Sequence, residues 1–123
     1  MLNADETIAL TNTLAQFHGS DTFTRHGLYQ RMLMTEGVVY LAKTANAFWL
    51  TDLIASHQLN PRVRAEEFQV WTLYVERNRG KAILTDGNNT TPIVTQEIEH
   101  TDFPLPEIAL WFIDGTLLLP SEY

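Results

Sequence analysis

The chain has 123 residues, of which 45% are hydrophobic and 19% charged, and its formal net charge is -7 at pH 7. This length and composition exclude intrinsic disorder, and we expect residues 1–123 to form a single domain. The acidic balance, 15 acidic against 8 basic residues, disfavours direct binding to nucleic acid, which needs clustered cations. Because the chain has no cysteine, disulfides and thiolate chemistry are excluded, and a reducing compartment is favoured.

The sequence offers no signal for export or membrane insertion. Its first six residues lack the basic segment and apolar core of a signal peptide, and no apolar run approaches the roughly 20 residues that span a bilayer. We therefore expect a cytoplasmic protein that makes no membrane contact.

The first helix is predicted from a start signal and an apolar stripe. Asn3 followed by Glu6 has the spacing of a capping box, and His18-Gly19-Ser20 is expected to end the helix. Residues 21–31 have no clear period, and we interpret them as a loop or a short helical turn. The N-terminal half therefore begins with one helix followed by irregular chain.

Residues 35–57 carry the main helical pattern. Leu50, Leu53, Ile54 and His57 recur at spacings that place them on one helical face, and Asn46 is expected to divide the region into two helices. The second helix must end before Pro61, because the residue before a proline is pushed out of the helical conformation.

The C-terminal half is predicted to form strands separated by turn signals. Turns are expected at residues 77–80, 86–89 and 114–115, and the two prolines of residues 101–106 predict a stiff connector. The expected strands are residues 68–75, 81–85, 92–98, 108–113 and 116–119. We therefore predict an α+β fold, with an antiparallel β-meander of about five strands in the C-terminal half packed against the N-terminal helices.

The strand at residues 68–75 has apolar side chains at both odd and even positions. This pattern predicts that both faces of the strand are largely covered, with the N-terminal helices as the only candidate cover for the second face. Residues 117–119 are interpreted as a closing strand that Pro120 ends. The alternative is an exposed edge strand that pairs with a partner or with its own copy.

The charged and titratable residues do not form a local motif. The histidines, at positions 18, 26, 57 and 100, have no metal-binding spacing, and we predict neither a metal site nor a cofactor. The basic residues are scattered, and their closest grouping could form a small patch at one end of the sheet or act only as solvated charges. That grouping consists of Arg62, Arg64, Arg77, Arg79 and Lys81.

Asp52, Ser56 and His57 together offer an acid, a hydroxyl and a base on one helix. Consecutive helical residues point about 100° apart, so Ser56 and His57 cannot present a nucleophile and a base to one point. A simpler interpretation is a polar edge in which His57 forms a hydrogen bond at the helix end. We therefore name no catalytic residue.

Aromatic residues are numerous for so small a chain, and most should belong to the core. An alternative is that at least one of Trp71 and Trp111 lies on an exposed face and marks a binding surface. The candidate residues for binding a ligand or a partner are Tyr40, Trp49, Asp52, His57, Trp71 and Trp111.

Several segments together resemble an uncharacterised bacterial family, a domain of unknown function met in bacterial, plasmid and phage sequences. The segments that carry the resemblance are residues 37–42, 48–58, 68–71, 96–98, 101–105 and 114–123. The resemblance implies a compact domain of bacterial or mobile-element origin, and it assigns no reaction, cofactor or site residue.

The sequence leaves the function open between two classes. The favoured hypothesis is a small soluble accessory protein, without enzymatic activity, that acts by contact with a protein partner or forms a homo-oligomer. The alternative is a small-molecule-binding domain or enzyme with a pocket between the sheet and the helices. Trp49, Trp71 and Tyr40 would line that pocket, and His57 and Asp52 would make it polar.

Overall fold

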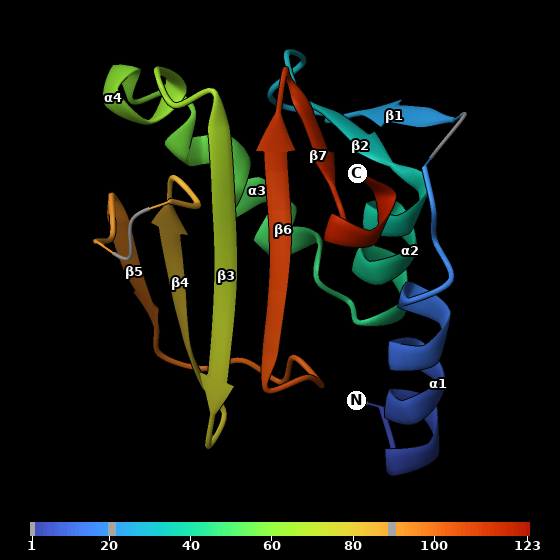
Figure 1. The fold of residues 1–123 in the computed structure, drawn as a ribbon. Helices are drawn as coiled ribbons and strands as arrows, with labels where there is room; N and C mark the ends of the chain where they lie inside the picture. Colours follow the sequence, from blue (N-terminus) through green and yellow to red (C-terminus); the bar gives the residue numbers. More distant parts are fainter. Residues whose placement is uncertain (1, 20–21, 89–90) are drawn as a thin grey trace.

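The computed structural model describes residues 2–19, 22–88 and 91–123. It confirms the α+β class: helices pack with one mostly antiparallel sheet (Figure 1). The helices are α1 (Ala4–Leu14), α2 (Glu36–Thr44), α3 (Phe48–His57), α4 (Pro61–Arg64) and the 3-10 helix η1 (Pro120–Glu122). The strands are β1 (Phe23–Arg25), β2 (Leu33–Thr35), β3 (Phe68–Glu76), β4 (Arg79–Thr85), β5 (Val94–Ile98), β6 (Glu107–Ile113) and β7 (Thr116–Leu118).

The sheet has more strands than the predicted five, and it is not a simple meander. Its order is β1-β2-β7-β6-β3-β4-β5, so the long strand β3 lies between β4 and β6. The pairing of β2 with β7 is parallel, whereas the other pairings are antiparallel. Two short strands from the N-terminal half thus extend the sheet that the C-terminal half builds.

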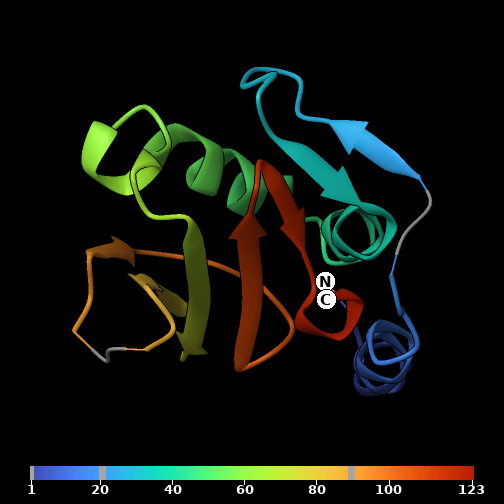
Figure 2. The ribbon, with the colours of Figure 1, turned by 45° about the horizontal axis from the view of Figure 1, so that its top comes forward.

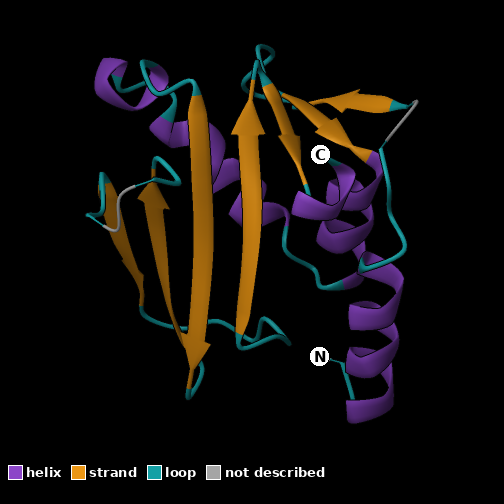
Figure 3. Ribbon diagram, in the orientation of Figure 1, coloured by secondary structure: helices purple, strands orange, loops and turns teal. Residues whose placement is uncertain are grey.

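The helices leave part of the sheet uncovered. In Figure 2, α3 crosses one face of β3 and β6, with α4 beyond its end, and none of the described helices lies over the opposite face of these strands. In Figure 3, α1, α2 and η1 gather beside β7 and β2, at the other end of the sheet. The central strands β6, β3 and β4 therefore have a helix-covered face and an open face.

Local signals explain where the helices begin and end. Asn3 Oδ1 accepts a hydrogen bond from the Glu6 backbone N–H (2.8 Å), and the Glu6 carboxylate accepts one from the Asn3 N–H (3.2 Å), so the predicted capping box is confirmed. Asn46 has a φ of 52° and separates α2 from α3, as predicted. The short helix α4 was not predicted. It can begin at Pro61 because proline at the first helical position loses no hydrogen bond.

The predicted hairpins are confirmed at two turns. Arg77 and Asn78 have φ values of 53° and 61° between β3 and β4, and Asp114 and Gly115 have φ values of 49° and 77° between β6 and β7. Two consecutive positive φ angles twist a two-residue turn in the sense that antiparallel strands require. Asn89, in the turn predicted at 86–89, lies outside the described residues.

The prediction that both faces of β3 are largely covered is wrong. Gln69, Trp71 and Leu73 are buried on the side of α3. On the other side Phe68, Val70 and Thr72 are half-buried, and Tyr74 is 44% exposed. The second face stays open because α3 packs on the odd-numbered side of β3, while α1 and α2 lie beside β7 and β2 (Figures 2 and 3). Apolar side chains on the open face therefore need another explanation.

One smaller prediction is wrong, and two alternatives are excluded. Residues 21–31, predicted as loop or a short helical turn, contain the strand β1. The helix α1 ends at Leu14, before the predicted stop at residues 18–20. Ser20 and Asp21 lie outside the described residues. The last strand is not an edge, since β7 pairs with both β6 and β2. The basic residues form no single patch, because α4 precedes β3 and the Arg77–Lys81 turn follows it, at opposite ends of that strand (Figure 1).

Candidate functional site

The open face of the sheet carries a groove of about 770 Å³. Its floor follows β3, whose even-numbered side chains alternate outward because successive residues of a strand point to opposite faces. The β4–β5 loop borders one side, and Trp111 of β6 borders the other. The described lining residues are Phe68, Val70, Thr72, Tyr74, Ile83, Thr85, Asp86, Gly87, Asn88, Pro92 and Trp111. We call this surface the open groove.

An aromatic cluster stands at one end of the open groove. The ring centroids of Phe68 and Trp111 are 5.1 Å apart, and those of Trp111 and Tyr123 are 5.4 Å apart, with tilted or edge-on ring planes. Trp111 is half-buried, and Tyr123 is 76% exposed. Clustered aromatic rings that remain accessible to solvent are a common feature of protein contact surfaces.

The charged residues around the open groove are of both signs. Asp86 lines it, and Tyr74 stands in the sheet between Glu107 on β6 and Lys81 on β4. Lys81 forms an ion pair with Glu97 of β5 at 3.4 Å. Glu76, Arg77 and Arg79 stand at the same end, so the charges beside Tyr74 are of mixed sign, and Asp86 is the charged side chain among the described lining residues.

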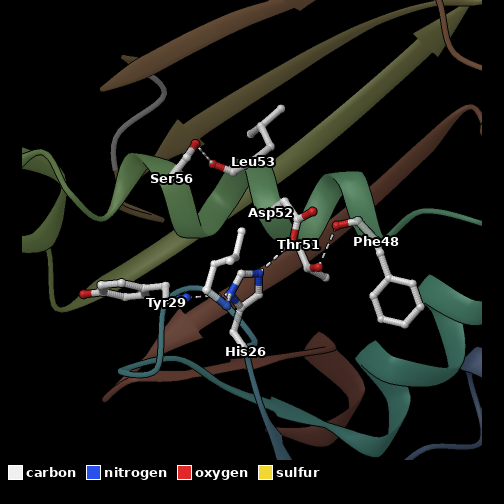
Figure 4. Close-up of polar contacts among 8 residues, drawn as sticks. His26, Tyr29, Phe48, Thr51, Asp52, Leu53 and Ser56 are labelled. Carbon is white, nitrogen blue, oxygen red and sulfur yellow. Dashed lines mark hydrogen bonds and ion pairs between the residues drawn. The ribbon is translucent and has the colours of Figure 1, made fainter.

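A second polar arrangement joins the β1–β2 connection to α3 (Figure 4). The His26 ring is 4% exposed, and its Nε2 lies 2.8 Å from Asp52 Oδ1. Its Nδ1 accepts hydrogen bonds from the backbone N–H groups of Leu28 (3.2 Å) and Tyr29 (2.9 Å). Since Nδ1 faces two donors, Nε2 must carry the proton that is donated to Asp52.

This His26–Asp52 pair is arranged for structure rather than catalysis. A catalytic imidazole oriented by a carboxylate keeps its second nitrogen available to a nucleophile or a substrate. In this chain the second nitrogen is engaged by two backbone amides, and the ring is buried. The pair therefore holds residues 26–32 against α3. A small cavity of about 180 Å³ lies beside it, bordered in part by the exposed side chains of Leu28 and Leu59.

The three residues that resembled a triad in sequence have separate partners. Asp52 binds His26, the Ser56 hydroxyl donates to the Leu53 carbonyl at 2.7 Å, and His57 Nε2 lies 2.6 Å from Gln96 Oε1 on β5. The predicted polar edge of α3 thus connects to two different parts of the fold. His57 bonds a side chain of the sheet, not the helix end.

Trp71 belongs to a buried amide network. The side chains of Gln58 and Gln69 exchange two hydrogen bonds, of 2.8 and 2.9 Å, and Gln69 Oε1 also accepts from the Trp71 indole N–H at 2.9 Å. Gln69 donates further to the Val63 carbonyl at 3.0 Å. Gln58, Gln69 and Trp71 are at most 2% exposed, so this network fastens α3 and α4 to β3.

The remaining candidates lie apart from the open groove. Tyr40 on α2 packs its ring 5.6 Å from that of Phe17, and Trp49 on α3 is half-buried against the core. Between α3 and the sheet, the space bordered by Leu50, Ile54 and Trp71 admits no water-sized molecule. Of the six candidate residues, Trp111 alone lines the open groove.

The sequence offered only a partial signal for this surface. Val70 and Thr72 on β3 and Ile83 on β4 share the open face. The alternation within a strand does not show whether a helix covers its odd-numbered or its even-numbered residues. His26 was missed because its partner lies 26 positions further along the chain.

No group of three or more His, Cys, Asp or Glu side chains within residues 2–19, 22–88 and 91–123 is arranged to hold a metal ion. None of the helices described for this chain combines the length and apolar character needed to cross a membrane.

Fold and surface together define an α+β domain in which helices cover one face of a seven-stranded sheet and leave a groove on the other. Within this class, residues 8–123 match the family model described as a family of unknown function (DUF6876). The chain belongs to that family. Searches of the curated proteins and of the solved structures found no match.

Proposed function

We propose that this chain is a protein-interaction domain whose contact surface is the open groove. The observation that carries the proposal is the combination of accessible aromatic rings and half-buried apolar side chains on a sheet face without a helical cover. Apolar side chains such as Val70 and Ile83 gain about 25 cal/mol for each Å² that a partner removes from water. A contiguous apolar surface on a soluble domain commonly marks a place of contact.

The composition of the groove supports a macromolecular partner. Trp and Tyr are enriched among the residues that dominate binding energy, and Trp111, Tyr74 and Tyr123 lie in or beside this surface. The net charge of the chain, -7, disfavours a nucleic acid and favours a basic or neutral protein. A homo-oligomer that uses the same face is the competing arrangement within this proposal.

We further propose a bacterial setting, including plasmid- and phage-borne copies, and a cytoplasmic location. The sequence resemblance described above supports the origin, and the cysteine-free composition supports a reducing compartment.

Affinity capture with a matched pair of variants tests the proposed function. Thr72→Lys places a charge on the floor of the groove, and Thr24→Lys places the same charge on the exposed strand β1, away from it. We expect one stoichiometric protein to be retained from host lysate by the natural chain and by Thr24→Lys, and lost with Thr72→Lys. Equal retention by both variants would overturn the proposal, and a bound metabolite without a protein would support the small-molecule alternative.

A further inference from the structure

We propose that the outer edge of β5 pairs with the same edge of a second copy of the chain, so that two sheets join into one across a two-fold axis. This contact goes beyond the proposed function, because it uses the rim of the sheet and not the open groove. Three observations support it: the backbone groups that the sheet leaves unpaired on β5, the side chains that the axis brings together, and the poorer fit of the other free edges.

The strand β5 is the last strand on its side of the sheet. It pairs with β4 alone, and in Figure 1 none of the described helices and strands lies beyond it. The edge of a sheet offers unpaired N–H and C=O groups to another chain, and many proteins protect such an edge with lysine, proline or a very short strand. The five residues of β5 include neither lysine nor proline. Its edge is therefore open to pairing.

Alternation along β4 and β5 decides which backbone groups face outward. The two-residue turn between β3 and β4 makes Glu76 and Arg79 a hydrogen-bonded pair, so the even-numbered residues of β4 direct their backbone groups to β5. Residues 94, 96 and 98 are their partners. Thr95 and Glu97 therefore direct their N–H and C=O groups away from the sheet, and within the described residues no strand pairs with them on that side.

A two-fold axis beside Gln96 satisfies all four outward groups. In the antiparallel pair, Thr95 of each copy lies opposite Glu97 of the other, and each of these two pairs exchanges two N–H···O=C hydrogen bonds. The same axis places Val94 opposite Ile98, two half-buried apolar side chains. Both lie on the helix-covered face, as does Gln96, whose side chain meets His57 of α3 at 2.6 Å. The edge is thus complementary to itself in hydrogen bonds and in apolar contacts.

No charge directly faces a like charge in this register. Glu97 is the one charged residue of β5, and in its own chain it is paired with Lys81 at 3.4 Å. The charged residues at the ends of β4 and β5, outside the paired segment, are Arg79, Asp86 and Glu99. The two Glu97 carboxylates would stand on a diagonal, and each copy carries a net charge of -7. Repulsion therefore opposes the contact, and added salt should strengthen the dimer by screening it.

The other free edges of the sheet fit a second copy less well. The strand β1, at the opposite rim, has three exposed residues and lacks a half-buried apolar row. Residues 107–110 of β6 are unpaired on the side of β7, because β7 pairs only with residues 111–113. That stretch lies inside the sheet, with β7 in line with it and α1 on the same side of β6 (Figures 1 and 2). It suits a single extended segment, whereas a whole folded copy can approach β5.

Sedimentation equilibrium of the full chain tests the contact at protein concentrations up to about 1 mM, at low and at high salt. Amide hydrogen exchange followed by NMR, at the two ends of this concentration range, locates it. We expect a weak dimer that forms more readily at high salt. The N–H groups of Thr95 and Glu97 should gain protection as the concentration rises, whereas that of Gln96, already bonded to β4, should change little.

Variants at Thr95 test the pairing and its register. Thr95→Pro removes an outward N–H that the monomer does not use, so this variant should fold and remain monomeric. Thr95→Glu places a carboxylate opposite Glu97 of the second copy and should weaken the dimer by about three- to tenfold, whereas Thr95→Lys should strengthen it by a similar factor. The matched controls, Thr11→Glu and Thr11→Lys, make the same charge changes on exposed α1 and should have smaller effects.

The contradicting results are distinct. A monomer at every concentration, or a dimer that Thr95→Pro leaves intact, would overturn the contact. Equal effects of Thr95→Lys and Thr11→Lys would overturn the register about Gln96, and this comparison holds even where the proline variant does not fold. A dimer that Thr72→Lys abolishes and Thr95→Pro retains would move self-association to the open groove. The lysate capture tests the proposed function separately, because a partner of the groove should be retained by Thr95→Pro.

Discussion

The carboxylate of Glu122 lies where a side chain on Gly37 would have to be placed. A β-carbon built on Gly37 would stand 2.7 Å from Glu122 Oε1 and 2.6 Å from Leu119 Cδ1. Glu122 is 8% exposed, and it accepts hydrogen bonds from the Thr35 hydroxyl (2.6 Å), the Leu119 N–H (2.9 Å) and the Gly37 N–H (3.3 Å). The carboxylate thus binds the start of α2, where the helix dipole favours a negative charge.

Replacing Gly37 by alanine should therefore destabilise the protein. Alanine in a helix normally gains roughly 0.5–1 kcal/mol over glycine, but here the overlap with two held side chains should reverse the sign, with a net loss of about 1–2 kcal/mol. Urea unfolding followed by circular dichroism measures the difference. The control is Gly27→Ala, whose β-carbon would meet no atom within 4 Å and should leave stability within about 1 kcal/mol. A more stable Gly37→Ala variant would contradict the described approach of Glu122.

The Gln58–Gln69 pair should show strong energetic coupling. Gln69→Leu leaves the Trp71 N–H and the Gln58 amide without their partner in a buried site, which should cost about 3 kcal/mol of unfolding free energy. The double variant Gln58→Leu/Gln69→Leu should cost less than the sum of the two single variants, because it removes both amides of the pair together. Additive single effects in denaturant titrations would show that the amides do not act as a pair.

The His26 imidazole should protect the amides of the chain segment it binds. In His26→Phe a ring is kept but the acceptor for the Leu28 and Tyr29 N–H groups is lost, so both amides should exchange with solvent faster. Hydrogen exchange followed by NMR measures this directly. Asp52→Asn retains an oxygen that can accept from Nε2 and should change these rates less than Asp52→Ala. Unchanged exchange at both amides in His26→Phe would contradict the hydrogen bonds described for Nδ1.

A lysine introduced at two adjacent residues of β3 should destabilise the protein to very different extents. Leu73 is 1% exposed beneath α3, so Leu73→Lys should lose several kcal/mol and largely unfold, since a buried unpaired charge is costly. Thr72 is half-buried on the open face, so Thr72→Lys should lose only about 1 kcal/mol and stay folded. Thermal unfolding of the two variants compares them. A folded Leu73→Lys variant, or an unfolded Thr72→Lys variant, would reverse the assignment of the two faces.

Much of the fold could be predicted because its signals are local. Asn3 with Glu6 marks the start of α1 by reciprocal side-chain hydrogen bonds. Asn46, and Asp114 with Gly115, mark boundaries by positive φ angles that few other residues favour. The strands β1 and β2 could not be predicted in this way. Each has three residues, too few to show a period. β2 joins the sheet by pairing with β7, a distant part of the chain, and β1 joins it only through β2.

The candidate site was less accessible to sequence reasoning. Trp71 and Trp111 occupy strands with the same two-sided apolar pattern, yet one is buried in the amide network and the other borders the open groove. Their difference arises from the placement of α3 on one side of the sheet, which is a property of the packed layers. The pattern within each strand is the same whichever side the helix takes.

Photo-crosslinking in the native host tests the central claim most directly. A photoreactive phenylalanine analogue replaces Tyr74 in the open groove, and in a matched variant it replaces Ile8, which is 59% exposed on α1. We expect irradiation to give an adduct with one protein from position 74 and no such adduct from position 8. No protein adduct from position 74, or the same adducts from both positions, would contradict a contact surface on the open face of the sheet.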